Sequence, residues 1–249
     1  MELGNTITIV TVFGHNDRIA REWMECHLKI VPEDITVYLV ENLVLPDPKV
    51  TLLLWKGCRE RRNWVLLSSL RHLVPYRYIS HGECLDIAIK FVRTPYVLVL
   101  DSDAFIQKWS VIEEMVKVAQ RENAAIVGHL MDYNITLPYI HPFCALYRVD
   151  CVRRFGMKER HYYPTLPPEY IKYWRDNPND VYKEVRKHYL DIGQKVYYDV
   201  INEGGKTVNF PVFEGVIHLW GATPFLWMWA WNNDYSIRIG RDKGRPFHL

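Results

Sequence analysis

The apolar and polar positions in the first half of the chain follow two alternating spacings. Short apolar runs rich in β-branched residues predict strands at residues 6–13, 35–40, 50–55, 96–100 and 124–130. Apolar residues that recur every three or four positions predict helices between these strands, at residues 17–31, 60–73, 82–92 and 110–123. Strands that alternate with helices predict an α/β fold, with a mostly parallel sheet and helices flanking its faces.

The second half is less regular, and its pattern predicts a smaller mixed region beside the sheet. Residues 141–150 predict a strand that leads into a short helix, and short strands are predicted at 206–213 and 215–221. Residues 161–180, which are rich in proline and aromatic side chains, predict a long surface loop or lid.

Residues 191–205 predict a further helix, in which apolar residues recur every four positions. Asp191 is a natural N-cap residue for this helix, and the glycine pair at 204–205 is a natural end. An N-cap carboxylate accepts hydrogen bonds from backbone N–H groups. A purely structural role for Asp191 is therefore the alternative to any chemical role.

The composition of the 249 residues narrows the classes of protein. With 49% hydrophobic and 24% charged residues, the chain has an ordinary globular composition. A net charge of +2 gives no general argument for nucleic-acid binding. We therefore expect no nucleic-acid partner.

The cysteines and apolar segments indicate a cytoplasmic protein. The five cysteines include no C-x-x-C pair, which favours reduced thiols. The first residues show no secretory signal pattern. The apolar run at 225–231 is shorter than the about 20 residues needed to cross a bilayer. Three interpretations of this run stay open, in decreasing order of preference: buried core, a platform for the acceptor, and a peripheral contact with a membrane surface.

Two aspartates, Asp101 and Asp103, follow directly after the apolar strand 96–100. In an extended chain, residues i and i+2 point to the same side, so the two carboxylates are expected to face one point. Such a pair repels unless a cation lies between the groups. Their oxygens suit Mn²⁺ or Mg²⁺, and such a metal could stabilise a diphosphate leaving group. A solvated turn is the alternative.

Several stretches, taken in order, resemble one known family. These are ITIVTVFGHND, VYLVEN, ISHGECLDIAIKFVRTPYVLVLDSD, FCALYRVDCVRRFGM and YLDIGQKVYYDVINEGGKTVNFPVFEGVIHLWG. Together they resemble the nucleotide-sugar glycosyltransferases of the GT-A fold, closest in pattern to the family-2 type. The resemblance implies one Rossmann-like catalytic domain over residues 1–249. Residues 1–130 would form its nucleotide-sugar-binding half and 131–223 its acceptor half, and 224–249 a C-terminal tail.

The resemblance also implies roles for individual residues. Metal ligands are implied at Asp101, Asp103 and His218. Contacts with the nucleotide sugar are implied at Thr11, Phe13, Asn16, Glu41, His81, Gly82, Asp101, Ser102 and Trp220. Asp191 takes the place of the base that deprotonates the acceptor in inverting enzymes. For several of these the alternatives stay open: core packing for His218 and Trp220, and a surface strand end for Glu41.

The sequence departs from the family pattern at several places. His81 stands where the family usually has Asn, and Glu41 where it usually has Asp. The usual Glu-Asp pair is reduced to Asp191, and the usual Arg of the following helix is absent. We expect a metal-dependent glycosyltransferase that moves a sugar, with inversion, from a UDP- or GDP-type donor to the hydroxyl of a glycan, lipid or protein acceptor. A decayed carbohydrate-binding or scaffold protein is the main alternative. A sugar nucleotidyltransferase is disfavoured, because the first strand is followed by one glycine and no nearby lysine.

Overall fold

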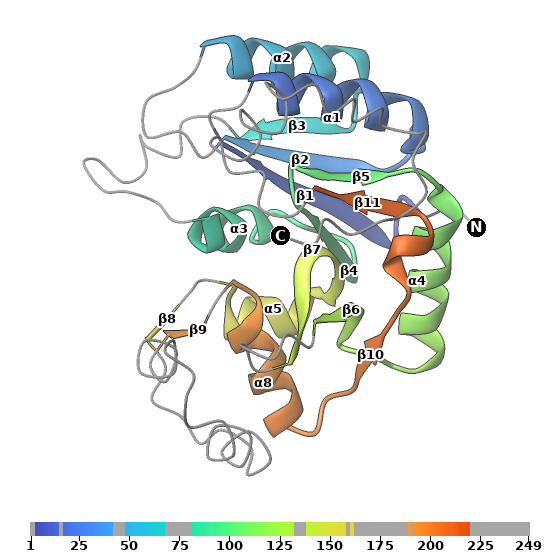
Figure 1. Cartoon of the computed structure of the whole chain (residues 1–249), viewed down its shortest axis with the longest axis vertical. Coiled ribbons are helices and arrows are strands. Elements are labelled where there is room, and N and C mark those ends of the chain that lie inside the picture. The colour runs from blue at the N-terminus through green and yellow to red at the C-terminus, as the bar shows by residue number, and fades with distance from the viewer. Residues whose placement is uncertain are drawn as a thin grey trace.

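A seven-stranded sheet forms the centre of the protein, and helices pack on both of its faces (Figure 1). The computed structural model describes residues 3–14, 17–41, 48–67, 81–131, 138–157, 160–161, 189–190 and 192–219. In spatial order the strands are β10 (Thr207–Asn209), β6 (Ile126–Met131), β7 (Tyr139–Arg148), β4 (Tyr96–Leu100), β1 (Ile7–Phe13), β2 (Thr36–Glu41) and β3 (Trp64–Leu67).

The strand directions make this a mostly parallel sheet, as predicted. Strands β3, β2, β1 and β4 run parallel to one another. Strand β7 is antiparallel to both of its neighbours, β4 and β6, and β10 is parallel to β6. Two small antiparallel pairs lie apart from the main sheet: β5 (Ala104–Ile106) with β11 (Val216–His218), and β8 (Arg160–His161) with β9 (Tyr189–Leu190).

The central strands are buried on both faces, and successive side chains pack into two separate cores. In β1, Ile7 and Ile9 join one core, whereas Val10 and Val12 join the other. The first core contains side chains of α1 (Asp17–Ile30), α2 (Pro48–Glu60) and α4 (Trp109–Arg121). The second contains side chains of α3 (His81–Ile89), α5 (Val149–Phe155) and α8 (Gln194–Asn202). This double burial explains the continuous apolar strands.

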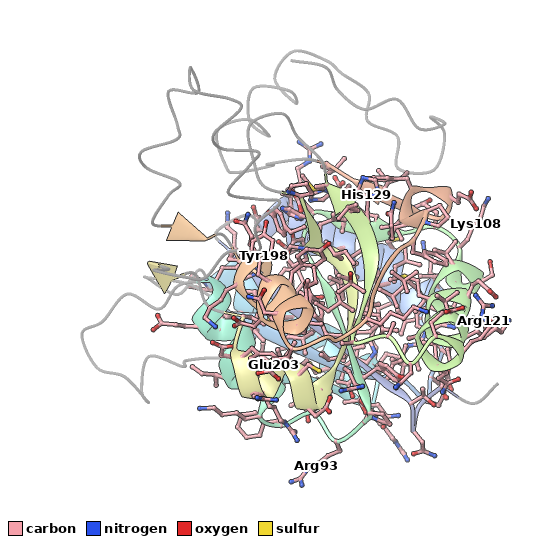
Figure 2. The ribbon with its side chains drawn as sticks, turned by 90° about the horizontal axis from the view of Figure 1, so that it is seen from below. Arg93, Lys108, Arg121, His129, Tyr198 and Glu203 are labelled. Atoms are coloured by element: carbon pink, nitrogen blue, oxygen red, sulfur yellow. The ribbon has the colours of Figure 1, made fainter. Side chains whose placement is uncertain are left out.

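The outer sides of the helices and loops carry charged residues. Arg93, Arg121 and Glu203 are exposed and extend away from the body of the molecule (Figure 2). In the part of the chain that the structure describes, no helix is both long and apolar enough to cross a membrane.

Two of the predicted elements are wrong. The strand expected at 50–55 is part of the helix α2, in which Val50 and Leu54 are buried while Leu52 and Trp55 are about half exposed. The helix expected at 60–73 gives way to the strand β3 at Trp64–Leu67. An apolar run of this length is compatible with either structure, and the spacing of the buried residues decides for a helix.

The helix predicted at 191–205 is shorter at its start. It begins at Gln194, and Gly193 occupies the N-cap position with φ 74°, a left-handed conformation that favours glycine. The predicted start of the helix, with its cap at position 191, is therefore wrong, because Gly193 is the N-cap residue. The helix ends at Asn202, before Gly204 at φ 74°, as expected. Most of the loop predicted at 161–180 and the apolar run at 225–231 lie outside the described residues, and the division into two halves stays a prediction.

Candidate functional site

The Asp-Ser-Asp segment forms a turn between β4 and β5. The Asp101 N–H donates to the Phe143 carbonyl (2.8 Å), which continues the pairing of β4 with β7. The Ala104 N–H then donates to the Asp101 carbonyl (3.0 Å), which closes the turn. The predicted extended geometry is therefore wrong, although the two carboxylates still converge. The reason is that the backbone reverses here to start β5, which pairs with β11.

His218 is brought to this turn by β11. In the ladder of β5 and β11, His218 lies opposite Ala104. The next residue, Leu219, donates its N–H to the Asp103 carbonyl (3.1 Å). The pairing thus fixes the backbone of His218 beside the two aspartates, although Asp103 and His218 are 115 positions apart in the sequence.

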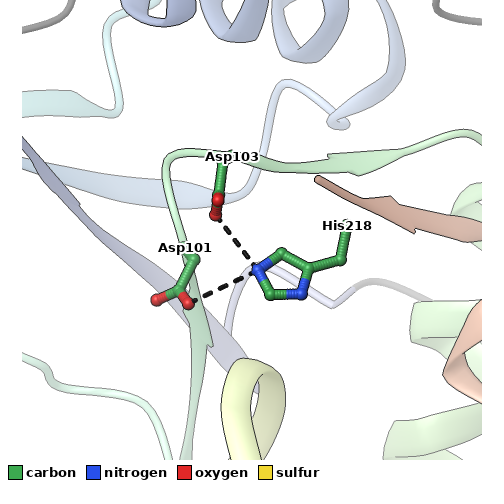
Figure 3. Close-up of side chains that lie close together, drawn as sticks. All are labelled: Asp101, Asp103 and His218. Atoms are coloured by element: carbon green, nitrogen blue, oxygen red, sulfur yellow. Dashed lines mark hydrogen bonds and ion pairs between the residues drawn. The ribbon is translucent and has the colours of Figure 1, made fainter. Parts of the chain in front are cut away.

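The three side chains meet at one point (Figure 3). His218 Nε2 lies 3.1 Å from Asp103 Oδ1 and 3.8 Å from Asp101 Oδ2. The imidazole is almost fully buried, with 4% of the side chain exposed, whereas the two carboxylates keep 18% and 15%. One atom from each residue lies within 4.8 Å of the others. The group is therefore buried on the histidine side and open to solvent on the carboxylate side.

These three side chains suit a hard divalent cation, one that prefers oxygen ligands. Two carboxylates and one imidazole offer oxygen and nitrogen ligands that suit Mn²⁺, and Mg²⁺ with its stronger preference for oxygen. The distances of 3.1 and 3.8 Å from His218 Nε2 to the two carboxylate oxygens fall within the about 3.0–4.2 Å that separates two ligand atoms sharing one ion at bonds of about 2.1 Å. Two carboxylates in a half-buried site also repel each other unless a positive charge lies between them.

Aromatic rings fix the plane of the His218 imidazole. The ring of Phe143 stacks on it with a centroid distance of 4.5 Å and an interplanar angle of 8°. On its other side, Phe143 stacks on Phe213 at 5.2 Å. The half-buried His129 packs edge-on against Phe213; its position is labelled in Figure 2. Because Phe143 is fully buried, its ring has little freedom to move.

A second histidine, His141, lies beside His218 at a ring distance of 6.2 Å. Burial, together with the neighbouring His218, lowers its pKa from 6.5 to about 3. Its Nδ1 accepts a hydrogen bond from the Phe143 N–H (3.2 Å), so the proton of the neutral ring is on Nε2. Sequence reasoning missed Phe143 and His141. Their spacing of two on a strand was the only signal that could have found them.

The carboxylate of Asp101 also affects groups in the neighbouring core. Burial raises the pKa of the Tyr147 phenol and of the Cys144 thiol, and the Asp101 charge adds to both effects. Both groups are therefore neutral at pH 7 and add no charge to the site.

The residues predicted to contact the donor lie in different environments. Thr11 and Phe13 are fully buried, and Phe13 packs edge-on against Trp23 in the core. Glu41 lies at the carboxyl end of β2, opposite Phe13, with 7% of its surface exposed. Its carboxylate accepts a short hydrogen bond from the Thr51 hydroxyl of α2. These contacts with a donor stay predictions.

Other predicted residues lie closer to the aspartates or outside the described chain. His81 is the first residue of α3, and its Nε2 lies 3.9 Å from Asp101 Oδ1, while the neighbouring Gly82 is buried. Ser102 is a half-buried residue of the turn. The remaining predicted residues, Asn16, Asp191 and Trp220, lie outside the described residues, and their roles stay predictions.

The comparisons with known proteins give partial structural matches. No model of a known protein family matches the sequence, and no curated protein matches it. The structure matches solved structures of GT-A glycosyltransferases. One is the mannosyltransferase PcManGT from Pyrobaculum calidifontis in complex with GDP-Man and Mn²⁺, with 12% identity, a TM-score of 0.47, and coverage of 59% of this chain and 46% of that chain.

Two further matches are to the S. aureus protein TarS, as its fragment 1–349. The fragment alone has 15% identity and a TM-score of 0.44, over 60% of this chain and 48% of that chain. The same fragment in complex with UDP-GlcNAc has the same identity and TM-score, over 60% and 47%. The matched part of each of these proteins is less than half of its length.

Proposed function

We propose that the chain is a metal-dependent glycosyltransferase that moves a sugar from a nucleoside diphosphate donor to an acceptor hydroxyl. The observation that carries this proposal is the convergence of Asp101, Asp103 and His218 at the carboxyl end of β4. In open α/β sheets, ligands bind beyond the carboxyl ends of the strands. A cation site at this edge therefore lies where a nucleotide would bind.

In this proposal the three side chains hold Mn²⁺ or Mg²⁺, and the ion would neutralise charge on the diphosphate leaving group. The chain's own contribution is orientation. The turn hydrogen bonds fix the two aspartates, the pairing of β5 with β11 fixes His218, and Phe143 fixes the plane of the imidazole. The two carboxylates are the more exposed members of the group, so diphosphate oxygens would reach the ion from their side.

The nucleotide would bind across the ends of β1, β2 and β4. Glu41 ends β2 opposite Phe13, and it is held toward α2 by the Thr51 hydroxyl. A carboxylate at this place could accept hydrogen bonds from a base or a ribose. If the reaction inverts the anomeric centre, Asp191 is the proposed base, and it comes three residues before α8 begins at Gln194.

Donor binding is tested by calorimetric titration of UDP-, GDP- and TDP-sugars, with and without Mn²⁺. We expect one donor class to bind in the presence of Mn²⁺ and to lose this binding when the metal is removed. The variant Asp103→Asn should abolish the metal-dependent part of donor binding. Asp150→Asn is the matched control, since Asp150 pairs with Arg148 on the surface. No metal-dependent binding of any donor would contradict the proposal.

Catalysis needs a separate test, because a decayed enzyme could still bind a donor. We expect slow hydrolysis of the bound donor in the wild type and none in Asp103→Asn. The variant Asp191→Asn should keep donor binding and lose transfer. A protein that binds a donor but neither hydrolyses nor transfers its sugar would instead be a carbohydrate-binding or scaffold protein.

A further inference from the structure

The carboxylate of Asp101 lies between two histidines. Its Oδ2 is 3.8 Å from His218 Nε2, and its Oδ1 is 3.9 Å from His81 Nε2. The two imidazoles come from distant elements, since His218 ends β11 and His81 begins α3. The two oxygens of one carboxylate therefore face two different rings.

The Nε2 atom of His81 is buried without a hydrogen bond to the described residues. The side chain as a whole is 32% exposed, but Nε2 is shielded from solvent and has no hydrogen-bond partner among the residues that the structure describes. A buried polar atom left unpaired is unfavourable, because it has lost its hydrogen bonds to water. Asp101 Oδ1, at 3.9 Å, is beyond the about 3.2 Å limit for a good hydrogen bond. A movement of about 1 Å would close this gap.

His81 is less suited to bind the ion directly. Among the described residues, the group whose ligand atoms all lie within 4.8 Å of one another contains Asp101, Asp103 and His218, and His81 is not part of it. It faces the oxygen of Asp101 that is directed away from His218. This is the place of a partner that orients a ligating carboxylate.

We propose that His81 is a positioning residue of the metal site. When an ion is bound through Asp101 Oδ2, the Nε2–H of His81 donates to Oδ1 and holds the carboxylate in one orientation. The inference rests on the metal site of the proposed function. Ligating carboxylates are generally hydrogen-bonded in this way, and loss of such a partner typically lowers metal affinity by about 10–100-fold.

The test is a titration of the full chain with Mn²⁺ alone, followed by the electron paramagnetic resonance signal of the free ion. We expect His81→Ala to weaken Mn²⁺ binding by about 10–100-fold. The variant His81→Gln, whose amide N–H can reach Oδ1, should recover most of this loss. His27→Gln is the control, because it removes another buried imidazole, one whose nitrogens hydrogen-bond to the backbone, and it should bind Mn²⁺ like the wild type.

A second measurement separates positioning from direct ligation. Electron spin echo modulation of bound Mn²⁺ detects directly coordinated nitrogen. We expect the signal of one nitrogen, from His218, in both the wild type and His81→Gln. Thermal unfolding without metal checks that both His81 variants are folded.

The outcomes are distinct. Wild-type affinity in a folded His81→Ala, or loss of a coordinated nitrogen in His81→Gln, would overturn the positioning role and leave the metal site in place. Failure of His81→Gln to recover affinity would also overturn it, because the hydrogen bond would then not be the cause. If the wild type binds no Mn²⁺, the metal site of the proposed function fails, and this inference fails with it.

Discussion

The two ends of strand β5 each contact a buried histidine, and the two histidines have different kinds of partner. At the Ile106 end, His27 Nδ1 donates to the Trp23 carbonyl (2.8 Å), and Nε2 accepts from the Ile106 N–H (3.2 Å). At the other end, His218 Nε2 faces the carboxylates of Asp101 and Asp103. The backbone uses both nitrogens of His27, whereas His218 directs a nitrogen toward acidic side chains.

Burial and stacking do not distinguish the two histidines. Both are largely buried, and both stack on aromatic rings, His27 at 4.0 Å on Trp23 and His218 at 4.5 Å on Phe143. The difference lies in the atoms that the ring nitrogens face. Backbone partners indicate a structural role, and a pair of carboxylates indicates a ligand role.

The strongest test of this comparison replaces each histidine by alanine. His27→Ala removes two hydrogen bonds and leaves a cavity, so the free energy of unfolding should fall by about 3–5 kcal/mol. His218→Ala also empties a buried site, but its Nε2 faces two partly exposed carboxylates rather than backbone groups, so we expect a smaller loss, of about 1–2 kcal/mol. Chemical denaturation without metal measures both values.

Mn²⁺ binding should show the opposite order. His218→Ala removes a proposed ligand and should weaken Mn²⁺ binding by about 100-fold or more, whereas folded His27→Ala should bind like the wild type. Equal losses in the two variants would show that the difference between the two ends of β5 is not functional.

The next largest effect is stabilisation by the metal. At 100 times its dissociation constant, a ligand of the native state alone raises the free energy of unfolding by about 2.7 kcal/mol. We expect this gain from Mn²⁺ in the wild type and in His27→Gln, and none in Asp103→Asn. Thermal unfolding at fixed Mn²⁺ concentrations measures it. A full gain in Asp103→Asn would place the bound ion elsewhere.

His27 also predicts a pH dependence of stability. Burial lowers its pKa in the folded protein to about 3, below its ordinary value of 6.5. Between these two values the unfolded chain binds more protons, so stability is complete above pH 6.5 and falls as the pH decreases toward 3. From pH 7 to pH 5, His27 should account for a loss of about 2 kcal/mol.

The variant His27→Gln measures this contribution. The difference in unfolding free energy between the wild type and this variant should shrink by about 2 kcal/mol when the pH is lowered from 7 to 5. A constant difference over this range would mean that His27 is not buried as a neutral ring.

The smallest effect concerns the ring plane of His218. Phe143→Leu removes the stacked ring but keeps an apolar side chain, so Mn²⁺ binding should weaken by less than about tenfold. Phe13→Leu, an equally buried change against Trp23, is the control and should leave binding of Mn²⁺ alone unchanged. If both variants bind alike, stacking does not position His218.

Much of the fold could be predicted from residue spacing. The strands β1 and β4 are continuous apolar runs, and the structure buries every residue of both. The error at α2 arose because VTLLLW is as apolar as a strand. Pro48 at the first helical position and the buried pair Val50 and Leu54 were the signals for a helix. The short strand β3 was missed because the helix predicted at 60–73 covered its residues.

The three residues that converge, Asp101, Asp103 and His218, could be found from the sequence, but their geometry could not. Asp101 and Asp103 could be found from their place after a buried strand, and His218 came from the family resemblance. The turn at Asp101 depends on the pairing of β5 with a strand more than a hundred residues away. The approach of His81 to Asp101 and the stacking of Phe143 depend on that same tertiary packing, which no local pattern contains.

The 115 positions between Asp103 and His218 also affect the order in which the site forms during synthesis. A ribosome adds about 5–20 residues per second, so the two aspartates are made roughly 5 to 25 seconds before the histidine. During this interval the nascent chain holds only a pair of carboxylates, which bind divalent ions weakly. In the proposed metal site, binding of an ion by all three side chains would therefore follow the docking of β11, after translation has passed residue 218.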